Sequence, residues 1–181
     1  MHTDDRALRE IERPTISVPP GRFAASFYWY ENDPELFRLE CHAMTRPESP
    51  FRNFTLRKES DGRLSWFGQI APGLMDGGRP TFTLHAVYDH NHPSNDTYGG
   101  SVKIYMIDPD LDELMKQIPI PHLLRDGAGS VYLCTARRED FKTGRVTTSA
   151  VSALGWAAKW IGLFELYLSD EITFDEFSQH V

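Results

Sequence analysis

Short runs of alternating apolar and polar residues fill the first two thirds of the chain. Alternation with a period of two puts apolar side chains on one face of an extended strand, so it predicts half-buried β-strands. Glycine, proline and aspartate separate these runs, and Asp61-Gly62 is a pair typical of a tight hairpin turn. We predict an antiparallel four-stranded meander with strands at residues 36–43, 64–70, 81–88 and 101–107.

The last third of the chain changes to a helical pattern. From Thr147 onward, apolar residues recur every three or four positions, and Thr148 or Ser149 can cap the helix that they predict. Two apolar stripes run along this helix, so most of its surface must be covered by the rest of the molecule. The first stripe holds Ala150, Leu154, Ala157, Ile161, Phe164 and Leu168, and the second holds Trp156, Trp160, Leu163 and Tyr167.

Three shorter helices complete the predicted elements. They lie at residues 4–13, at 109–117 and at 173–179, where Thr173 and Glu176 have the spacing of a capping box. Residues 118–130 contain prolines and glycines and are predicted to be irregular. The sequence therefore predicts one α+β domain over residues 1–181, with an N-terminal helix, a meander, an irregular loop and C-terminal helices.

Composition and charge exclude several classes of protein. The chain has 181 residues, of which 40% are hydrophobic, which is typical of an ordinary globular core. Its net charge of −7 argues against nucleic acid as the main partner. Lys159 and Glu165 interrupt the most apolar stretch, which favours a buried helix over a membrane span. Without a basic and apolar leader at its start, we expect a cytoplasmic protein.

The two cysteines, Cys41 and Cys134, lie far apart in the sequence. This usage fits a reducing compartment, where a single thiol stays available for chemistry. Cys41 falls on a predicted strand and is expected to be part of the core. Cys134 follows a short apolar run and precedes Arg137 and Arg138, which favour the thiolate or meet an acidic partner. From these residues alone, Cys134 is either a buried core cysteine or a nucleophile.

The order of these features over residues 4–168 resembles the ubiquitin-conjugating enzyme family, and its divergent bacterial branch in particular. Residues 64–72, Leu-Ser-Trp-Phe-Gly-Gln-Ile-Ala-Pro, are similar to the second strand of the family. Gly77-Gly78 followed by residues 82–88 are similar to the next hairpin and strand of the family. The family's active-site segment has a His-Pro-Asn triplet, a glycine turn and then the catalytic cysteine; His122 precedes Cys134 here by 12 residues, with Asp126-Gly127 between them.

The resemblance implies a cysteine thioester acyl transferase with a ubiquitin-conjugating fold. Cys134 would accept a ubiquitin-like protein from an adenylating activating enzyme and pass it to a lysine amine of a protein substrate. His122 would orient the active-site loop, and Arg6 and Arg9 on the first helix would dock the activating enzyme. No cofactor is expected in this chain, because ATP is used upstream. Bacterial relatives suggest gene clusters that include a metalloprotease deconjugase, some of them for antiphage defence.

One departure from the family pattern affects the expected chemistry. Leu123-Leu124 stand where the family has Pro-Asn, so the amide that stabilises the oxyanion is missing from its usual place. We interpret Tyr132 as pointing to the site, on the opposite side from Leu133. The possible replacement donors are the Tyr132 hydroxyl, backbone N–H groups of residues 127–130, Asn91 and Asn95.

Other functions stay open on the sequence. A catalytically inactive member of the same fold would bind a ubiquitin-like protein or another partner without carrying it. An unrelated cysteine hydrolase needs a His and Asp set that this sequence does not display in a recognisable order. An exposed part of the Trp156 and Trp160 stripe would suit the ubiquitin-like protein or a second copy of the chain.

His85, His90 and His92 raise the question of a metal site. His90 and His92 face one side only if the segment is extended, and no cysteine or carboxylate has the spacing of a zinc site. We therefore interpret residues 89–92 as a solvated turn and expect no metal.

Overall fold

The computed structural model describes residues 27–71, 81–93, 100–135 and 149–180. The predicted helix at 4–13 and the arginines expected to contact partners, Arg6, Arg9, Arg137 and Arg138, lie outside these ranges, as does the turn at Gly77-Gly78.

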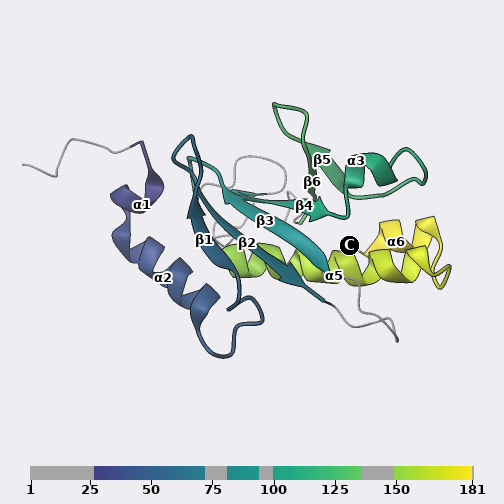
Figure 1. Ribbon diagram of the computed structural model, residues 1–181, viewed down its shortest axis with the longest axis horizontal. Helices are drawn as coiled ribbons and strands as arrows, with labels where there is room; N and C mark the ends of the chain where they lie inside the picture. Colours follow the sequence, from purple (N-terminus) through teal and green to yellow (C-terminus); the bar gives the residue numbers. More distant parts are fainter. Residues whose placement is uncertain (1–26, 72–80, 94–99, 136–148, 181) are drawn as a thin grey trace, which may run out of the picture.

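An antiparallel six-stranded sheet forms the centre of the described part of the chain (Figure 1). Its order is β1-β2-β3-β4-β6-β5, so a meander of four strands is extended at β4 by the β5–β6 hairpin. The α+β class is confirmed, and the sheet is larger than predicted. The strands are β1 (Thr55–Lys58), β2 (Leu64–Ile70), β3 (Phe82–Tyr88), β4 (Val102–Asp108), β5 (Leu123–Arg125) and β6 (Val131–Leu133).

Three of the four predicted strands are confirmed as β2, β3 and β4. The hairpin turn at Asp61-Gly62 is confirmed as well, since it joins β1 to β2. Gly62 has a φ of 85°, and a Cβ atom there would lie 2.3 Å from the Tyr28 ring. Only glycine satisfies both the backbone conformation and the packing at this turn.

The predicted strand at residues 36–43 is wrong, because Pro34–Thr45 form helix α2. Asp33 caps this helix by accepting the N–H of Leu36 at 2.9 Å, and a proline occupies its first turn. The helix buries Glu40 and Met44, which are four residues apart. Because a polar residue, Glu40, occupies the buried face, the apolar residues do not recur with the helical period. Their spacing instead resembles the alternation of a strand.

The long C-terminal helix is confirmed as α5 (Ala150–Leu168), with Ser149 as its cap. It runs along one face of the sheet, with α6 (Phe174–His180) beside its far end (Figure 1). The first predicted stripe is buried apart from Leu168, whereas in the second stripe Trp160 is buried and Trp156 is 47% exposed. None of the described helices has the length and hydropathy of a membrane-spanning segment.

The short helices differ more from expectation. The helix predicted at 109–117 is reduced to α3 (Leu111–Leu114), and α1 (Trp29–Asn32) precedes α2. The capping box of α6 is confirmed, since the Thr173 N–H donates to Glu176 Oε2 at 2.8 Å and the Glu176 N–H donates to Thr173 Oγ1 at 3.3 Å. The segment predicted to be irregular contains β5.

A buried carboxylate joins α2, the sheet and α5. Glu40 Oε2 accepts the Tyr88 hydroxyl at 2.8 Å and the Ala150 N–H, in the first turn of α5, at 3.0 Å. The Trp66 indole N–H donates in turn to the Tyr88 hydroxyl at 3.1 Å. Burial raises the pKa of Glu40, although both hydrogen bonds favour its charged form. The helix N-terminus also stabilises a negative charge at this position.

The segment at 89–92 is not the solvated turn that we predicted. His92 is 3% exposed, its Nδ1 lies 2.9 Å from Ser101 Oγ, and its Nε2 lies 3.7 Å from Glu40 Oε1. Burial lowers the pKa of His92 to about 4, so the ring is neutral at physiological pH. His90 packs against the Phe27 ring, with centroids 4.5 Å apart.

Glu40→Leu is expected to lower the free energy of unfolding by about 3 kcal/mol, because the Tyr88 hydroxyl and the Ala150 N–H lose their buried acceptor. Glu40→Gln is the matched control. It keeps one carbonyl oxygen for both donors and should cost less than about 1 kcal/mol at neutral pH. Denaturant unfolding followed by tryptophan fluorescence measures both variants, and equal losses would contradict the role given to this acceptor.

The raised pKa of Glu40 also predicts a pH dependence. The folded protein retains a proton on Glu40 at a pH where the unfolded chain has lost it. The stability that this group contributes is therefore full below its unfolded pKa and is lost as the pH rises through the folded pKa. Wild type should therefore gain stability relative to Glu40→Gln as the pH falls from neutral toward the ordinary pKa of a glutamate. A pH-independent difference between the two proteins would argue against this.

Candidate active site

Cys134 follows the last residue of β6 and is half-buried. Its N–H donates to the carbonyl of His122 at 2.8 Å, so the pairing of β5 with β6 continues one residue beyond Leu133. Because side chains alternate along a strand, Cys134 and Tyr132 lie on the face opposite to Leu133, which is fully buried in the core. The predicted nucleophile therefore lies on the face of the sheet that α5 does not cover.

His122 is held on both its backbone and its side chain. Its φ is 57°, in the left-handed region that a residue with a Cβ rarely adopts. Its Nε2 lies 2.7 Å from the carbonyl oxygen of Ser178 in α6; since a carbonyl only accepts, Nε2 carries the proton. The Trp160 indole N–H donates to the Pro121 carbonyl at 3.3 Å. Helices α5 and α6 thus hold the backbone that pairs with Cys134.

Leu123 and Leu124 belong to β5. They pair with Leu133 and Tyr132 of β6, and both are half-buried. The two positions where the family pattern has Pro-Asn are therefore strand residues with apolar side chains. This arrangement leaves no side-chain amide at that point.

Tyr132 lies beside Cys134 on the open face and is 5% exposed. Its ring centroid is 5.8 Å from that of Tyr105 and 5.6 Å from the Lys103 ammonium nitrogen. Burial raises the pKa of Tyr132, and the nearby charges of Asp89, Cys134 and Asp126 raise it further. The phenol therefore keeps its proton at neutral pH and can act as a donor.

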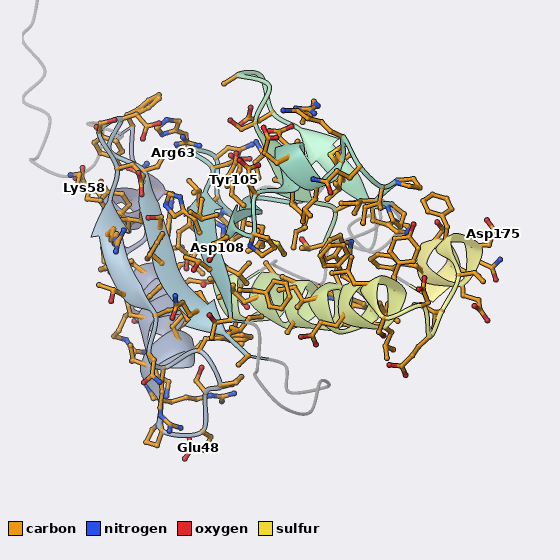
Figure 2. All side chains as sticks on the ribbon, turned by 45° about the vertical axis from the view of Figure 1, so that its right-hand side comes forward. Glu48, Lys58, Arg63, Tyr105, Asp108 and Asp175 are labelled. Atoms are coloured by element: carbon orange, nitrogen blue, oxygen red, sulfur yellow. The ribbon has the colours of Figure 1, made fainter. Side chains whose placement is uncertain are left out.

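A polar groove of about 470 Å³ continues this face between the β1–β2 hairpin and the β5–β6 turn. Its lining includes Glu59, whose carboxylate lies 2.9 Å from His85 Nε2. The Tyr105 hydroxyl donates to Asp126 Oδ2 at 2.9 Å across the same groove. Tyr105 points to the side away from α5 and lies between Arg63 and the β5–β6 hairpin (Figure 2). The open face is thus polar and hollowed next to Tyr132.

Asp126 is fixed at the turn that leads into β6. Burial disfavours its charged form, but hydrogen bonds from the Tyr105 hydroxyl and from the N–H groups of Ser130 and Ala128 hold its pKa below the usual value. The Asp126-Gly127 turn expected before the cysteine is present and is ordered by this carboxylate. Of the other proposed donors, Asn91 is exposed and Asn95 lies outside the described residues.

An ion pair beside Tyr132 was missed in the sequence. Lys103 of β4 lies 3.1 Å from Asp89, which follows β3. Lys103 lies in a strand that the sequence predicts. Its neighbours, however, depend on the pairing of β4 with β6, which no local sequence pattern indicates. Cys41, by contrast, packs against the core from α2 as a core cysteine, and burial raises its pKa.

Among the described residues, no three His, Cys, Asp or Glu side chains lie close enough together to hold a metal ion. The histidines considered for a metal have other partners: His85 is next to Glu59 and His92 is next to Ser101.

A family model described as Type II CBASS E2 protein matches residues 42–172. The chain belongs to this family. No curated protein matches it significantly. As a Type II CBASS E2 protein, it is part of a bacterial branch related to the ubiquitin-conjugating enzymes, as the resemblance predicted. Membership supports a ubiquitin-conjugating-like role in antiphage defence and implies an activating enzyme and a ubiquitin-like protein as partners.

The family match spans the meander, His122, Cys134 and α5, and it ends just before α6. The contact between His122 and Ser178 therefore joins the matched part of this Type II CBASS E2 protein to a helix beyond it. His122 and helix α6 were both predicted from the sequence, but the contact between His122 and Ser178 of α6 was not.

His122→Ala should weaken the attachment of α6, because the Ser178 carbonyl loses its donor while the strained backbone angle remains. We expect a loss of about 1–2 kcal/mol in the free energy of unfolding and faster amide exchange in residues 173–180. His122→Gly loses the same hydrogen bond but relieves the strain, so it should cost about 1 kcal/mol less. Hydrogen exchange with mass spectrometry measures both, and unchanged exchange in α6 would count against this coupling.

Proposed function

We propose that this chain carries a ubiquitin-like protein as a thioester on Cys134 and transfers it to a lysine amine of a target protein. The observation that carries the proposal is the position of Cys134. It is half-buried directly after β6, on the face of the sheet that α5 does not cover, with its N–H bound to the His122 carbonyl. Such a thiol is open to an acyl donor while its backbone is fixed. Family membership supports the same reading.

The chemistry requires two acyl transfers, one onto sulfur and one away from it. A thiolate suits both, because it attacks an incoming thioester readily and leaves readily when an amine attacks. His122 takes a positioning role, since its hydrogen bonds go to the Ser178 carbonyl and to the Cys134 backbone. No proton transfer by its ring is needed.

Tyr132 is the proposed donor in place of the missing asparagine. Its side chain is on the same face as Cys134, and its raised pKa keeps the hydroxyl protonated. A donor of this kind in an enzyme that relies on it contributes ~2.7–4 kcal/mol to the transition state.

The proposed partners follow from this function. An activating enzyme supplies the thioester and docks on the N-terminal segment with Arg6 and Arg9. Arg137 and Arg138, after the cysteine, meet an acidic partner surface. A metalloprotease deconjugase would reverse the modification, and the cytoplasm is the proposed compartment.

A non-catalytic binding module is the second candidate function. It is favoured by the half-buried, apolar Leu123-Leu124 at the place of the oxyanion amide. The same fold would then bind a ubiquitin-like protein without accepting it covalently.

A charging assay separates these two functions. Purified protein is incubated with an activating enzyme and a ubiquitin-like protein encoded beside it, with ATP, and analysed on non-reducing gels. We expect a thiol-sensitive adduct that is lost in Cys134→Ala and kept in Cys41→Ala, because Cys41 lies on a different element from the site. No adduct, with the activating enzyme itself demonstrably charged, would favour the binding module.

Tyr132→Phe tests the replacement donor. The variant keeps the ring that packs on Tyr105 and removes only the hydroxyl. Discharge of the Cys134 thioester to free lysine should slow by about 100-fold, within the range for loss of one oxyanion donor, while charging by the activating enzyme is less affected. Single-turnover discharge measures this rate, and an unchanged rate would rule out the hydroxyl as the donor.

A further inference from the structure

Lys103 and Asp89 form a shielded ion pair on the open face of the sheet. The Lys103 ammonium lies 3.1 Å from Asp89 Oδ1, and the two side chains are 17% and 16% exposed. The same ammonium lies 5.6 Å from the centroid of the Tyr132 ring. Because the pair is mostly withdrawn from water, its charges act more strongly on neighbouring groups than surface charges do.

The strand register brings Lys103 next to Cys134. β4 and β6 run antiparallel with Ile104 opposite Leu133. One further step of the same register, just beyond the end of β6, places Lys103 opposite Cys134. The pair on the other side, Tyr105 and Tyr132, has ring centroids 5.8 Å apart, as this register requires. Directly opposed residues have Cβ atoms about 4.5–5.5 Å apart and share a face of the sheet.

Several ionisable groups surround Lys103, and the charge of one affects the pKa of another. Lys103 helps to lower the pKa of Asp126, and Asp89 helps to raise that of Tyr132. The ionisable groups around Lys103 and Cys134 are Asp89 after β3, Tyr105 on β4, Asp126 in the β5–β6 turn and Tyr132 on β6, whereas the His122 ring is bound to the Ser178 carbonyl of α6.

We propose that Lys103, oriented by Asp89, stabilises the negative charge on the Cys134 sulfur when it attacks an acyl donor and when it leaves. The role in transfer rests on the proposed thioester function. The charge on the sulfur, however, is a property of this chain alone and can be measured without any partner.

The transfer step shows where this charge matters. The lysine nitrogen of the acceptor forms a bond to the thioester carbonyl carbon, and the carbon–sulfur bond breaks. The electron pair of that bond returns to Cys134 Sγ as a thiolate, and the nitrogen releases its proton to solvent. Lys103 takes no part in the proton transfer and acts only by its charge.

Asp89 limits the effect of Lys103 as well as orienting it. Its carboxylate is the second charge of the pair, and a negative charge near a thiol disfavours the thiolate. Removal of one charge at a time should therefore shift the Cys134 pKa in opposite directions. A merely structural role of the pair would instead shift it in the same direction in both variants, through loosening of the strand.

The test measures the pKa of the Cys134 thiol from the pH dependence of its alkylation by iodoacetamide. A Cys41→Ser background leaves Cys134 as the one cysteine of the chain. Lys103→Met should raise the Cys134 pKa by about one unit, and Asp89→Asn should lower it by about half a unit. The double variant should return close to the starting value. Lys58→Met, on the edge strand β1 far from β6, is the control and should change nothing (Figure 2).

Unchanged alkylation in Lys103→Met, or shifts of the same sign in both single variants, would overturn the proposal. If the opposite shifts occur but wild type takes no thioester in the charging assay, the proposed function fails while the charge effect stands. If the thioester forms but the pKa shifts are absent, the proposed function stands and the proposed effect of Lys103 fails. Where both hold, discharge of Lys103→Met to lysine should be slower by about threefold, as expected for a leaving thiol of higher pKa.

Discussion

The Glu40 carboxylate is the contact through which the two main helices and the sheet are joined. It belongs to α2, accepts the hydroxyl of Tyr88 on β3, and accepts the Ala150 N–H at the start of α5. A buried carboxylate is costly unless its hydrogen bonds are satisfied, and a helix N-terminus supplies both a donor and a favourable dipole. The start of α5 is therefore fixed relative to the strands, and the direction of α5 along the sheet follows from it.

Further along α5, Trp160 contacts the segments that hold the candidate site. Trp160 packs on Phe177 of α6 at 5.4 Å and donates to the Pro121 carbonyl. The Ser178 carbonyl of α6 in turn accepts a hydrogen bond from His122 Nε2, and the His122 carbonyl accepts one from the Cys134 N–H. The backbone of the nucleophile is thus connected to the core through helices, whereas its side chain is on the open face. A thiol that exchanges acyl groups with large partners needs this combination of fixed position and access.

The parts of this molecule that could be predicted from the sequence are those written in local patterns. Strands β2, β3 and β4 alternate clearly, α5 has a long helical period, and the α6 cap has its pair at the required spacing. Helix α2 was misread because Glu40 lies on its buried face, and no local pattern indicates that a distant Tyr88 and Ala150 will satisfy that charge. Cys134 and His122 were found through the order of elements, but the neighbourhood of Lys103 was not, because it depends on the pairing of β4 with β6.

The proposed electrostatics explain how this site would work without an amide from the loop. The residues after His122 are used for strand pairing, which fixes the cysteine but leaves apolar side chains there. A cation on β4 is well placed to compensate, since a strand inside the sheet moves little and its charge is oriented before the reaction begins. A lone lysine would lower the thiol pKa further and make the thiolate a weaker nucleophile, because nucleophilicity falls with pKa and is best near ambient pH. Pairing Lys103 with Asp89 keeps the sulfur between these limits, so that it can both accept an acyl group and release it.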